Sequence, residues 1–381
     1  MSQQIASYRS QVTERNAAVT CDLRPAPNIG GVRYLGAYLP SYARHRVIQR
    51  GLYELGVEVE EIVDRGGLPA RWWRLAQALR RTPARTPIVV GEAGNYLTPV
   101  LLEARRLGLP LLFDPFISLR DSIEDTASGW RRATLAPLLE VIDRLNNWAA
   151  GAVILDTPQT RAYFVERLGL SPAKAHVAYV GAETNLFHPR PRPERANGPV
   201  RVLFYGTFIP LQGIDIIIRA AAELQRETPD VQFQIVGSGQ TSVEMRALAD
   251  QLQTRNVTFG PASVPYQQLP ELIASADICL GIFADRPKTA RVIPNKLYQC
   301  AAMGLPVITA NTPAIRAAFG AGELALVPPG DHQALAAAIL TLAADQEQRR
   351  LIGTAGMRAV HSRYSPRIVA TQVLEACQSI L

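Results

Sequence analysis

Cysteine is scarce in this chain of 381 residues, which contains four: Cys21, Cys279, Cys300 and Cys377. None belongs to a Cys-x-x-Cys pair, which argues against a disulfide framework and against a structural zinc site. Cys279 and Cys300 lie within apolar runs, so we expect them to be buried as small hydrophobic side chains. The five histidines lack metal-ligand spacing, and no Asp-x-Asp pair lies near a candidate site. We therefore expect neither a metal nor a cofactor.

Long apolar runs are absent as well. No stretch of about 18 apolar residues without charges occurs, so no membrane-spanning helix is predicted. The N-terminal stretch, MSQQIASYRSQVTERNAAV, lacks the apolar core of a signal peptide, and we expect a cytoplasmic protein. Hydrophobic residues make up 48% and charged residues 19% of the chain, which is typical of a well-packed globular protein.

The chain is basic, with a net charge of +7 and an isoelectric point near 9.4. Such a balance predicts affinity for anions such as nucleotide sugars, acidic lipids or nucleic acid. The sequence has no zinc-finger spacing and no aromatic-basic motif of the kind that binds nucleic acid. Nucleic acid is therefore not an expected partner.

Short apolar segments alternate with helical patterns along the whole chain, which predicts parallel sheets covered by helices on both faces. The expected strands are 32–38, 57–63, 86–91, 110–114, 151–157, 175–181, 200–206, 231–237, 256–260, 277–283, 306–311 and 324–328. The Pro-rich segment 188–199 is the best linker between the two halves. We expect two facing doubly wound α/β domains, 1–190 and 191–365, followed by a helical segment 366–381. Ligands of such sheets bind beyond the carboxyl ends of the strands, so the cleft between the domains is the expected site.

One segment, 291–311, predicts an anion site. Pro294 suits the first turn of a helix, and Gly304 with Pro306 predicts its end. Arg291, Asn295 and Lys296 then lie at a helix N-terminus, where cations and unpaired backbone N–H groups favour an anion. The alternative is a solvated basic loop at the start of a helix.

This segment resembles the donor-binding motif of family 4 of the retaining glycosyltransferases, which have the GT-B fold. In that family the motif is Pro-x-Lys, two residues, Glu, a small apolar run and Gly-x-Pro-Val-Ile. Further segments resemble the family in the same order: GAETNLFHP (181–189), RVLFYGTFIPLQGIDIIIRA (201–220), FQIVGSG (233–239) and NVTFGPASVPYQQLPELIASADICLGIF (256–283). The resemblance is good over 150–381 and looser over 30–150. It implies two Rossmann-like domains, a metal-independent reaction, and a last helix that crosses back to the first domain.

The resemblance implies that the C-terminal half binds a nucleotide-sugar donor, with a UDP- or GDP-sugar expected. The implied donor-binding residues are Gly206, Thr207, Gln212, Gly237, Ser238, Arg291, Val292, Ile293, Asn295, Lys296 and Gln299. Four of them depart from the family: Thr207 and Gln212 replace an Arg and a Lys, while Arg291 and Gln299 replace two glutamates. We expect Lys296 and Arg291 to be the main partners of the diphosphate. Gln299 could still bind ribose hydroxyls, and Arg291 could instead bind an acidic sugar.

In the N-terminal half, Asp114 is the candidate catalytic residue. It ends an apolar strand, and a carboxylate there points toward the cleft. It could act as base toward an acceptor hydroxyl or stabilise an oxocarbenium-like state. Alternatively it only positions the acceptor, or caps the following turn. Gly36, Tyr38 and Ser118 are the candidate acceptor-binding residues, with Gly36 allowing a substrate to approach the backbone.

The basic stretch 68–85 carries two tryptophans. One helix face, expected to be the core stripe, contains Leu68, Trp72, Leu75, Ala76 and Leu79. Trp73 lies off that stripe among arginines, which favours contact with a membrane surface at the inner face. A lipid-linked acceptor would follow from such contact. The alternative is an ordinary surface helix whose tryptophan packs on a neighbour.

Together these observations predict a retaining glycosyltransferase that moves a sugar from a nucleotide donor to a hydroxyl acceptor, in the synthesis of a polysaccharide, glycolipid or other glycoconjugate. One alternative is a nucleotide-sugar epimerase or a phosphorylase on the same fold. The other is a non-catalytic subunit, suggested by Thr207, Gln212, Arg291 and Gln299.

Overall fold

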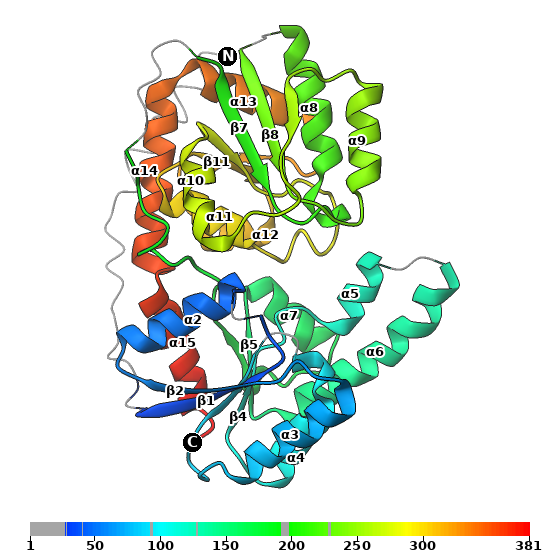
Figure 1. Cartoon of the computed structure of the whole chain (residues 1–381), viewed down its shortest axis with the longest axis vertical. Helices are drawn as coiled ribbons and strands as arrows, with labels where there is room; N and C mark the ends of the chain where they lie inside the picture. Colours follow the sequence, from blue (N-terminus) through cyan, green and yellow to red (C-terminus); the bar gives the residue numbers. More distant parts are fainter. Residues whose placement is uncertain are drawn as a thin grey trace.

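The structure, a computed structural model, describes residues 27, 29–39, 41–91, 94–126, 129–191, 198–227 and 230–381. Cys21, the N-terminal stretch tested for a signal peptide and residues 192–197 of the linker segment 188–199 lie outside these residues. Two parallel sheets of six strands form the molecule, in the orders β2-β1-β3-β4-β5-β6 and β12-β11-β10-β7-β8-β9. They belong to two α/β domains that lie one above the other in Figure 1. The doubly wound architecture expected from the sequence is therefore confirmed.

The strands lie where the apolar segments predict them. The N-terminal sheet contains β1 (Gly31–Gly36), β2 (Glu58–Val63), β3 (Ile88–Val90), β4 (Leu111–Phe113), β5 (Ala152–Leu155) and β6 (Ala175–Val177). The C-terminal sheet contains β7 (Val200–Tyr205), β8 (Val231–Val236), β9 (Val257–Phe259), β10 (Ile278–Leu280), β11 (Val307–Ala310) and β12 (Ala325–Val327). Central strands such as β3 and β4 are buried throughout, because helices cover both faces of a parallel sheet.

Helices cover both faces of each sheet. In the N-terminal half they are α2 (Ala43–Glu54), α3 (Leu68–Arg80), α4 (Thr98–Arg106), α5 (Leu119–Thr126), α6 (Gly129–Ala149) and α7 (Pro158–Glu166). The second half contains α8 (Ile214–Glu227), α9 (Ser242–Gln251), α10 (Leu269–Ala274), α11 (Asn295–Ala302), α12 (Pro313–Ala318), α13 (His332–Ala344), α14 (Gln346–Arg363) and α15 (Pro366–Gln378). Short 3-10 turns are η1 (Gly94–Tyr96), η2 (Pro172–Lys174), η3 (Pro210–Gln212) and η4 (Tyr266–Gln268).

The last helix returns to the first domain. Figure 1 shows α15, in red, beside α2, in blue. Val369 and Val373 of α15 share a buried cluster with Val32 and Ile48 of the N-terminal half. Gly51 permits this contact, since a Cβ atom there would lie 1.9 Å from the carbonyl oxygen of Pro366. The two domains are thereby joined by a packed helix as well as by the chain that links them.

The core stripe expected on α3 is correct in part. Leu75 and Leu79 are buried, and Trp72 donates its indole N–H to the Tyr96 carbonyl oxygen at 2.9 Å. Leu68, by contrast, is 44% exposed. It is the first residue of the helix.

Several expectations from composition can be compared with the described residues. Cys279 and Cys300 are free and buried, as predicted, and so is Cys377. Within the ranges described, no helix is both long enough and apolar enough to cross a bilayer. In the same ranges no group of three or more His, Cys, Asp and Glu side chains is arranged to hold a metal ion.

Candidate functional site

Two glycines bring the ends of β7 and β8 together. The backbone of Gly237 has a φ angle of 131°, and a Cβ atom there would lie 2.0 Å from the Gly206 carbonyl oxygen. Gly206 in turn donates its N–H to Val236 at 3.0 Å. Thr207 and Ser238 follow these glycines and are exposed. At the carboxyl ends of β7 and β8 the backbone is therefore not covered by side chains of Gly206 and Gly237.

Lys296 is a buried cation beside this backbone. Its side chain, on the first turn of α11, is only 5% exposed. Nζ donates to Oε1 of Gln212 at 2.5 Å and lies 3.5 Å from the centre of the Phe204 ring. A Cβ atom on Gly206 would be 3.3 Å from Nζ. The ammonium thus lies against the glycine turn, so a solvated surface position for Lys296 is excluded.

No carboxylate in the described part of the chain forms an ion pair with Lys296. Burial holds the pKa of its ammonium well below the ordinary value, because a charge removed from water is costly unless an opposite charge compensates it. Gln212, which is itself nearly buried, orients the ammonium but brings no negative charge. An anion at this point would supply the missing compensation.

The rest of α11 and the loop before it are mostly internal. Gln299 is buried and accepts a hydrogen bond from the Tyr205 hydroxyl at 2.8 Å. Ile293 belongs to the apolar core of the C-terminal domain, and Val292 and Asn295 are half-buried. Oδ1 of Asn295 is buried with no hydrogen-bond partner among the described residues. Lys296, Gln299 and Asn295 are thus held on one short helix, as the sequence predicts.

Arg291 has a partner in the other domain. Its guanidinium bonds both carboxylate oxygens of Asp121 on α5 at 2.9 Å and stacks on the Tyr163 ring at 4.0 Å. The Arg291 carbonyl oxygen also accepts from the hydroxyls of Thr157 and Thr160 at the start of α7. We expected the charge of Arg291 to lie beside the diphosphate. The carboxylate of Asp121, from the N-terminal domain, already neutralises it.

We expect Asp121→Ala to loosen this loop. Arg291 would remain partly buried without its carboxylate, at a cost of about 1–2 kcal/mol. Amide hydrogen exchange over 288–293 and α5 should then speed up. Exchanging the charges, with Arg291→Asp and Asp121→Arg together, should restore much of the protection. Glu347→Ala, which breaks an exposed pair with Arg350, is the control. Unchanged exchange in Asp121→Ala would show that the ion pair does not hold the loop.

Asp114 lies in a buried ion pair, which the sequence did not suggest. Its side chain is 1% exposed, as is that of Arg44 on α2. Nε of Arg44 lies 3.0 and 2.8 Å from the two carboxylate oxygens, and Nη1 donates to the Ala178 carbonyl oxygen at 2.9 Å. A carboxylate enclosed in this way has no access to an acceptor hydroxyl, so its contacts give the predicted catalytic role no support.

A second buried acid accompanies this pair. Asp156 follows β5, and burial raises the pKa of its carboxyl to about 6, although Arg44 acts in the opposite direction. The sequence carried a signal for it, since Asp156 ends an apolar strand in the same way as Asp114. Arg44 had no such signal, because only the packing of α2 brings it to the carboxyl ends of β4 and β5.

The candidate acceptor residues prove to be internal. Tyr38 is 1% exposed, and its ring centre lies 4.0 Å from that of His45. Ser118 is fully buried, and its hydroxyl accepts from the Asp121 N–H at 2.9 Å, which caps α5. Gly36 is needed because a Cβ atom there would lie 2.7 Å from the Tyr38 ring. These three residues shape the end of β1 and the start of α5, and the two side chains offer no open surface.

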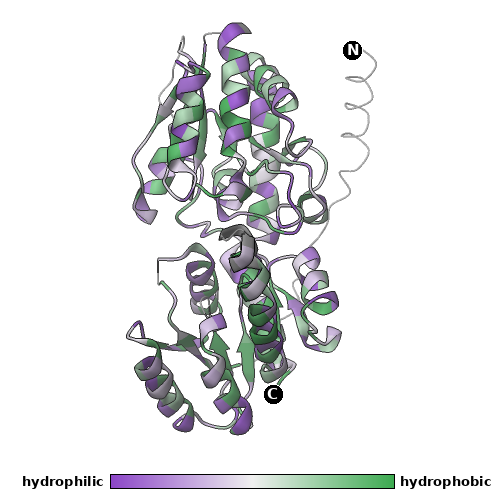
Figure 2. Ribbon diagram, turned by 90° about the vertical axis from the view of Figure 1, so that its right-hand side faces the viewer, coloured by the Kyte–Doolittle hydropathy of each residue, from purple (hydrophilic) through white to green (hydrophobic). Residues whose placement is uncertain are grey.

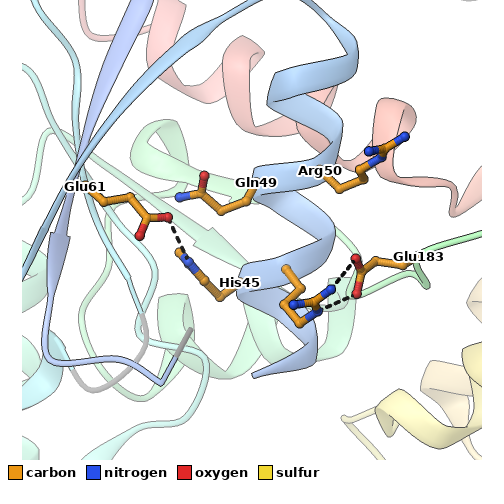
Figure 3. Close-up of a pocket in the computed structure, with 6 residues that line it drawn as sticks. His45, Gln49, Arg50, Glu61 and Glu183 are labelled. Atoms are coloured by element: carbon orange, nitrogen blue, oxygen red, sulfur yellow. Dashed lines mark hydrogen bonds and ion pairs between the residues drawn. The ribbon is translucent and has the colours of Figure 1, made fainter. Parts of the chain in front are cut away.

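A polar cavity of about 310 Å³ lies around α2. Figure 3 shows His45 and Gln49 directed toward Glu61, and Arg46 of the same helix forms an ion pair with Glu183. His45 Nε2 lies 3.3 Å from Glu61, and burial, followed by the charge of Arg46, lowers the pKa of His45 to about 4. At neutral pH the imidazole is therefore uncharged. This cavity contains amide, imidazole and carboxylate groups, all suited to hydroxyl groups.

Arg46 also reaches the second domain. Its guanidinium makes two hydrogen bonds to Glu183, at 2.7 and 3.0 Å, and lies 4.8 Å from the Tyr266 ring centre. Sequence reasoning did not single out Glu61 or Glu183. The exposed acids of β2 mark it as an edge strand, but no local pattern shows that Glu183 turns toward α2.

A larger cavity, of about 770 Å³, lies in the C-terminal domain. It is lined by residues that follow strands β7, β8, β10 and β12 and by residues along α8 and α9, including Pro210, Asp215, Thr241, Asp285 and Gly330. This position agrees with the rule that parallel sheets bind ligands beyond their carboxyl ends.

Two facing Rossmann-like domains, with glycine turns and a buried cation on the second, define the GT-B architecture. Residues 18–181 match the family described as "Glycosyl transferase 4-like domain", and residues 199–345 match "Glycosyl transferases group 1". The chain therefore belongs to the family 4, group 1 glycosyltransferases. The resemblance inferred from the sequence motifs is confirmed.

Curated relatives are distant. The MMP alpha-(1->4)-mannosyltransferase of Mycolicibacterium hassiacum is 24% identical over 72% of this chain and 66% of its own length. A GDP-mannose-dependent alpha-(1-6)-phosphatidylinositol monomannoside mannosyltransferase of Mycolicibacterium smegmatis is 27% identical over 60% and 61%. The matches thus span roughly three fifths to two thirds of these relatives.

Solved structures share the whole fold. HepE of Anabaena, in complex with UDP-glucose, superposes with a TM-score of 0.69 at 18% identity, over 92% of this chain and 99% of its own. Sucrose-phosphate synthase of Thermosynechococcus elongatus gives 0.68 at 16% identity, over 90% and 97%. At this level of identity the likeness establishes the fold alone.

Proposed function

We propose that this protein is a glycosyltransferase that binds a nucleotide-sugar donor at Lys296 and transfers the sugar to a hydroxyl group. The observation that carries the proposal is the buried ammonium without a carboxylate, set beside two glycine turns. A diphosphate brings negative charge and several acceptor oxygens, which the ammonium and the backbone N–H groups can bind.

A UDP- or GDP-sugar is the expected donor. HepE, which has the same fold, was solved with UDP-glucose, and one of the curated relatives is described as GDP-mannose-dependent. Gln299 and Tyr205 form a buried hydrogen-bonded pair on the same helix and strand as the cation. An amide can accept from ribose hydroxyls and donate to them, so we assign Gln299 to the nucleoside side. Arg291 could bind an acidic sugar only after leaving Asp121.

Transfer would proceed with retention of configuration and without a metal. Binding donor and acceptor between two domains supplies orientation and excludes the water that would hydrolyse the donor. Because Asp114 is enclosed by Arg44, we assign deprotonation of the acceptor to an oxygen of the departing phosphate. The polar cavity at His45 and Glu61 is the proposed place for acceptor hydroxyls that do not react.

The acceptor could be lipid-linked, with the protein acting in the cytoplasm at the inner face of a membrane. Trp73 is 63% exposed, as the membrane hypothesis requires. The nearby arginines are less available, since Arg74 pairs with Asp64 and Arg80 with Glu103. Trp73 alone therefore gives this hypothesis little support.

The test is a thermal-shift screen with UDP, GDP, ADP, TDP and their common sugars, followed by product analysis. We expect one nucleotide to raise the melting temperature, and the anomeric configuration of the product, measured by NMR, to match that of the donor. Release of nucleotide only when acceptor is present would support transfer. Turnover of the donor alone would instead favour an epimerase, and use of inorganic phosphate a phosphorylase.

A non-catalytic subunit is the second candidate. Arg291 is neutralised by Asp121 and Asp114 by Arg44, so two residues expected to serve the reaction are occupied. Such a subunit would bind no nucleotide sugar at millimolar concentration, or would bind one without turning it over with any acceptor.

A further inference from the structure

One face of α6 is apolar and exposed to solvent. Leu138, Val141 and Trp148 are 56%, 61% and 55% exposed. Leu135 and Leu145 are exposed on the same helix. Their spacing of three and four residues places them on one side of the helix, and positions 135–148 span about 20 Å. Arg144 is the one charged residue among the exposed residues of 133–148.

This face lies on the outer side of the N-terminal domain. Figure 1 shows α6 at the edge of the molecule, and Figure 2, which faces that edge, shows green residues along the helix. The buried side of the helix carries polar anchors: Asn146 donates to the Asn95 carbonyl oxygen and Asn147 to that of Leu168. Two asparagines therefore anchor the buried side of the helix, while its most exposed side chains are mainly apolar, unlike those of an ordinary surface helix.

Basic side chains lie on α6 and on the helices and loops near it. Arg106 and Arg80 on neighbouring helices are 63% and 60% exposed and share a single carboxylate, Glu103. Glu140 is likewise shared by three guanidinium groups, those of Arg120, Arg144 and Arg167. The C-terminal end of the helix adds Arg105, which lies 4.0 Å over the Trp148 ring, and Lys174, which donates to the Ala150 carbonyl oxygen at 2.7 Å. Positive charge thus exceeds negative charge around the apolar residues.

We infer that this α6 face docks the protein onto an anionic lipid bilayer. An apolar helix face rimmed by arginine and tryptophan fits the boundary between headgroups and acyl chains, where leucine and valine enter the apolar layer and guanidinium groups bind phosphate. A second copy of the chain is a poorer partner, because two faces with the same excess of positive charge would repel each other. The inference concerns a surface and does not depend on the proposed transfer reaction.

The test uses two double variants. The α6 variant carries Leu138→Asp and Val141→Asp, and the control carries Val243→Asp and Leu351→Asp. These two control residues are exposed in the C-terminal domain, so both double variants add the same charge at exposed positions. In flotation with vesicles of phosphatidylcholine and phosphatidylglycerol, we expect the wild type and the control to bind. The α6 variant should lose about tenfold or more in partition coefficient. Binding should also weaken with added salt and be much lower on phosphatidylcholine alone.

Three results would overturn the inference. One is an absence of binding to anionic vesicles at low salt, and another is equal loss in the two double variants. The third is a dimer in light scattering that the α6 variant converts to a monomer without any lipid binding, which would make the face a contact between copies. Circular dichroism melting of both variants checks that each is folded, and quenching of Trp148 by brominated lipid, absent in Trp148→Phe, reports insertion directly.

Discussion

Replacing Lys296 by methionine should raise the melting temperature of the free protein and abolish its stabilisation by a nucleotide. The ammonium is buried without a carboxylate, so removing its charge relieves a desolvation cost, for a gain of roughly 3–6 °C. The same change removes the cation that faces the diphosphate, and transfer should fall about a hundredfold or more. Differential scanning fluorimetry with and without nucleotide measures both effects.

The gain in stability should depend on pH. Burial lowers the pKa of Lys296, so above that pKa the unfolded chain binds more protons than the folded protein, and wild-type stability rises with pH. The advantage of the methionine variant is therefore largest below the folded pKa and disappears as the pH approaches the ordinary lysine value. A difference that stays constant with pH would contradict the assignment of an unpaired buried charge.

Gln212→Glu provides a matched variant. It places a carboxylate where Oε1 now accepts from Nζ, so it should raise the pKa of Lys296 and stabilise the free protein. The same carboxylate would compete with the diphosphate and weaken nucleotide binding. If either variant bound nucleotide as tightly as the wild type, Lys296 would not be the diphosphate ligand.

The second large effect is expected at the buried pair of Asp114 and Arg44. Asp114→Ala would leave the guanidinium, 1% exposed, without its carboxylate, at a cost of about 3–5 kcal/mol. The melting temperature should fall by roughly 10 °C. Arg44→Met with Asp114→Leu should recover much of this loss, since replacing both partners removes the unpaired charge. Chemical denaturation of the three proteins measures the free energies of unfolding.

Asp114→Asn separates the structural role of this residue from the catalytic one. If Asp114 is a catalytic base, the amide variant should keep its stability and lose only turnover. If the ion pair is structural, stability falls and any residual activity follows the folded fraction. Glu347→Ala, which breaks an exposed pair, should change stability by less than about 0.5 kcal/mol and serves as the reference.

The alternation of apolar segments with helical patterns, and the glycines and prolines between them, were enough to predict the architecture. Apolar segments such as those of β4 and β11 are buried on both faces, and continuous apolar runs of this kind are typical of parallel strands between two layers of helices. Glycines at 206 and 237 marked the strand ends for the same local reason, since the backbone angles and the close contact there exclude a side chain. Lys296 was found because its motif, a loop, a helix, a turn and a strand, lies within the continuous segment 291–311.

The partners of the charged residues followed no such local rule. Arg44 lies 70 positions from Asp114, and Arg291 lies 170 positions from Asp121. A carboxylate at the end of a strand suggests a catalytic residue until a guanidinium from another element neutralises it, and the sequence records no distance between the two. The exposed face of α6 was missed for a related reason, because its apolar spacing alone predicts a helix packed in a core.

The sequence by itself determined the fold class, the order of the strands along the chain, the glycine turns, and the short helix that carries Lys296. Each of these depends on residues near one another in the chain, where periodicity and backbone sterics act. Tertiary structure alone decided which charged residues are paired, which polar residues are buried, and which apolar helix face is exposed to solvent. Those outcomes depend on burial and on long-range Coulomb contacts, which exist only once the helices and sheets have packed.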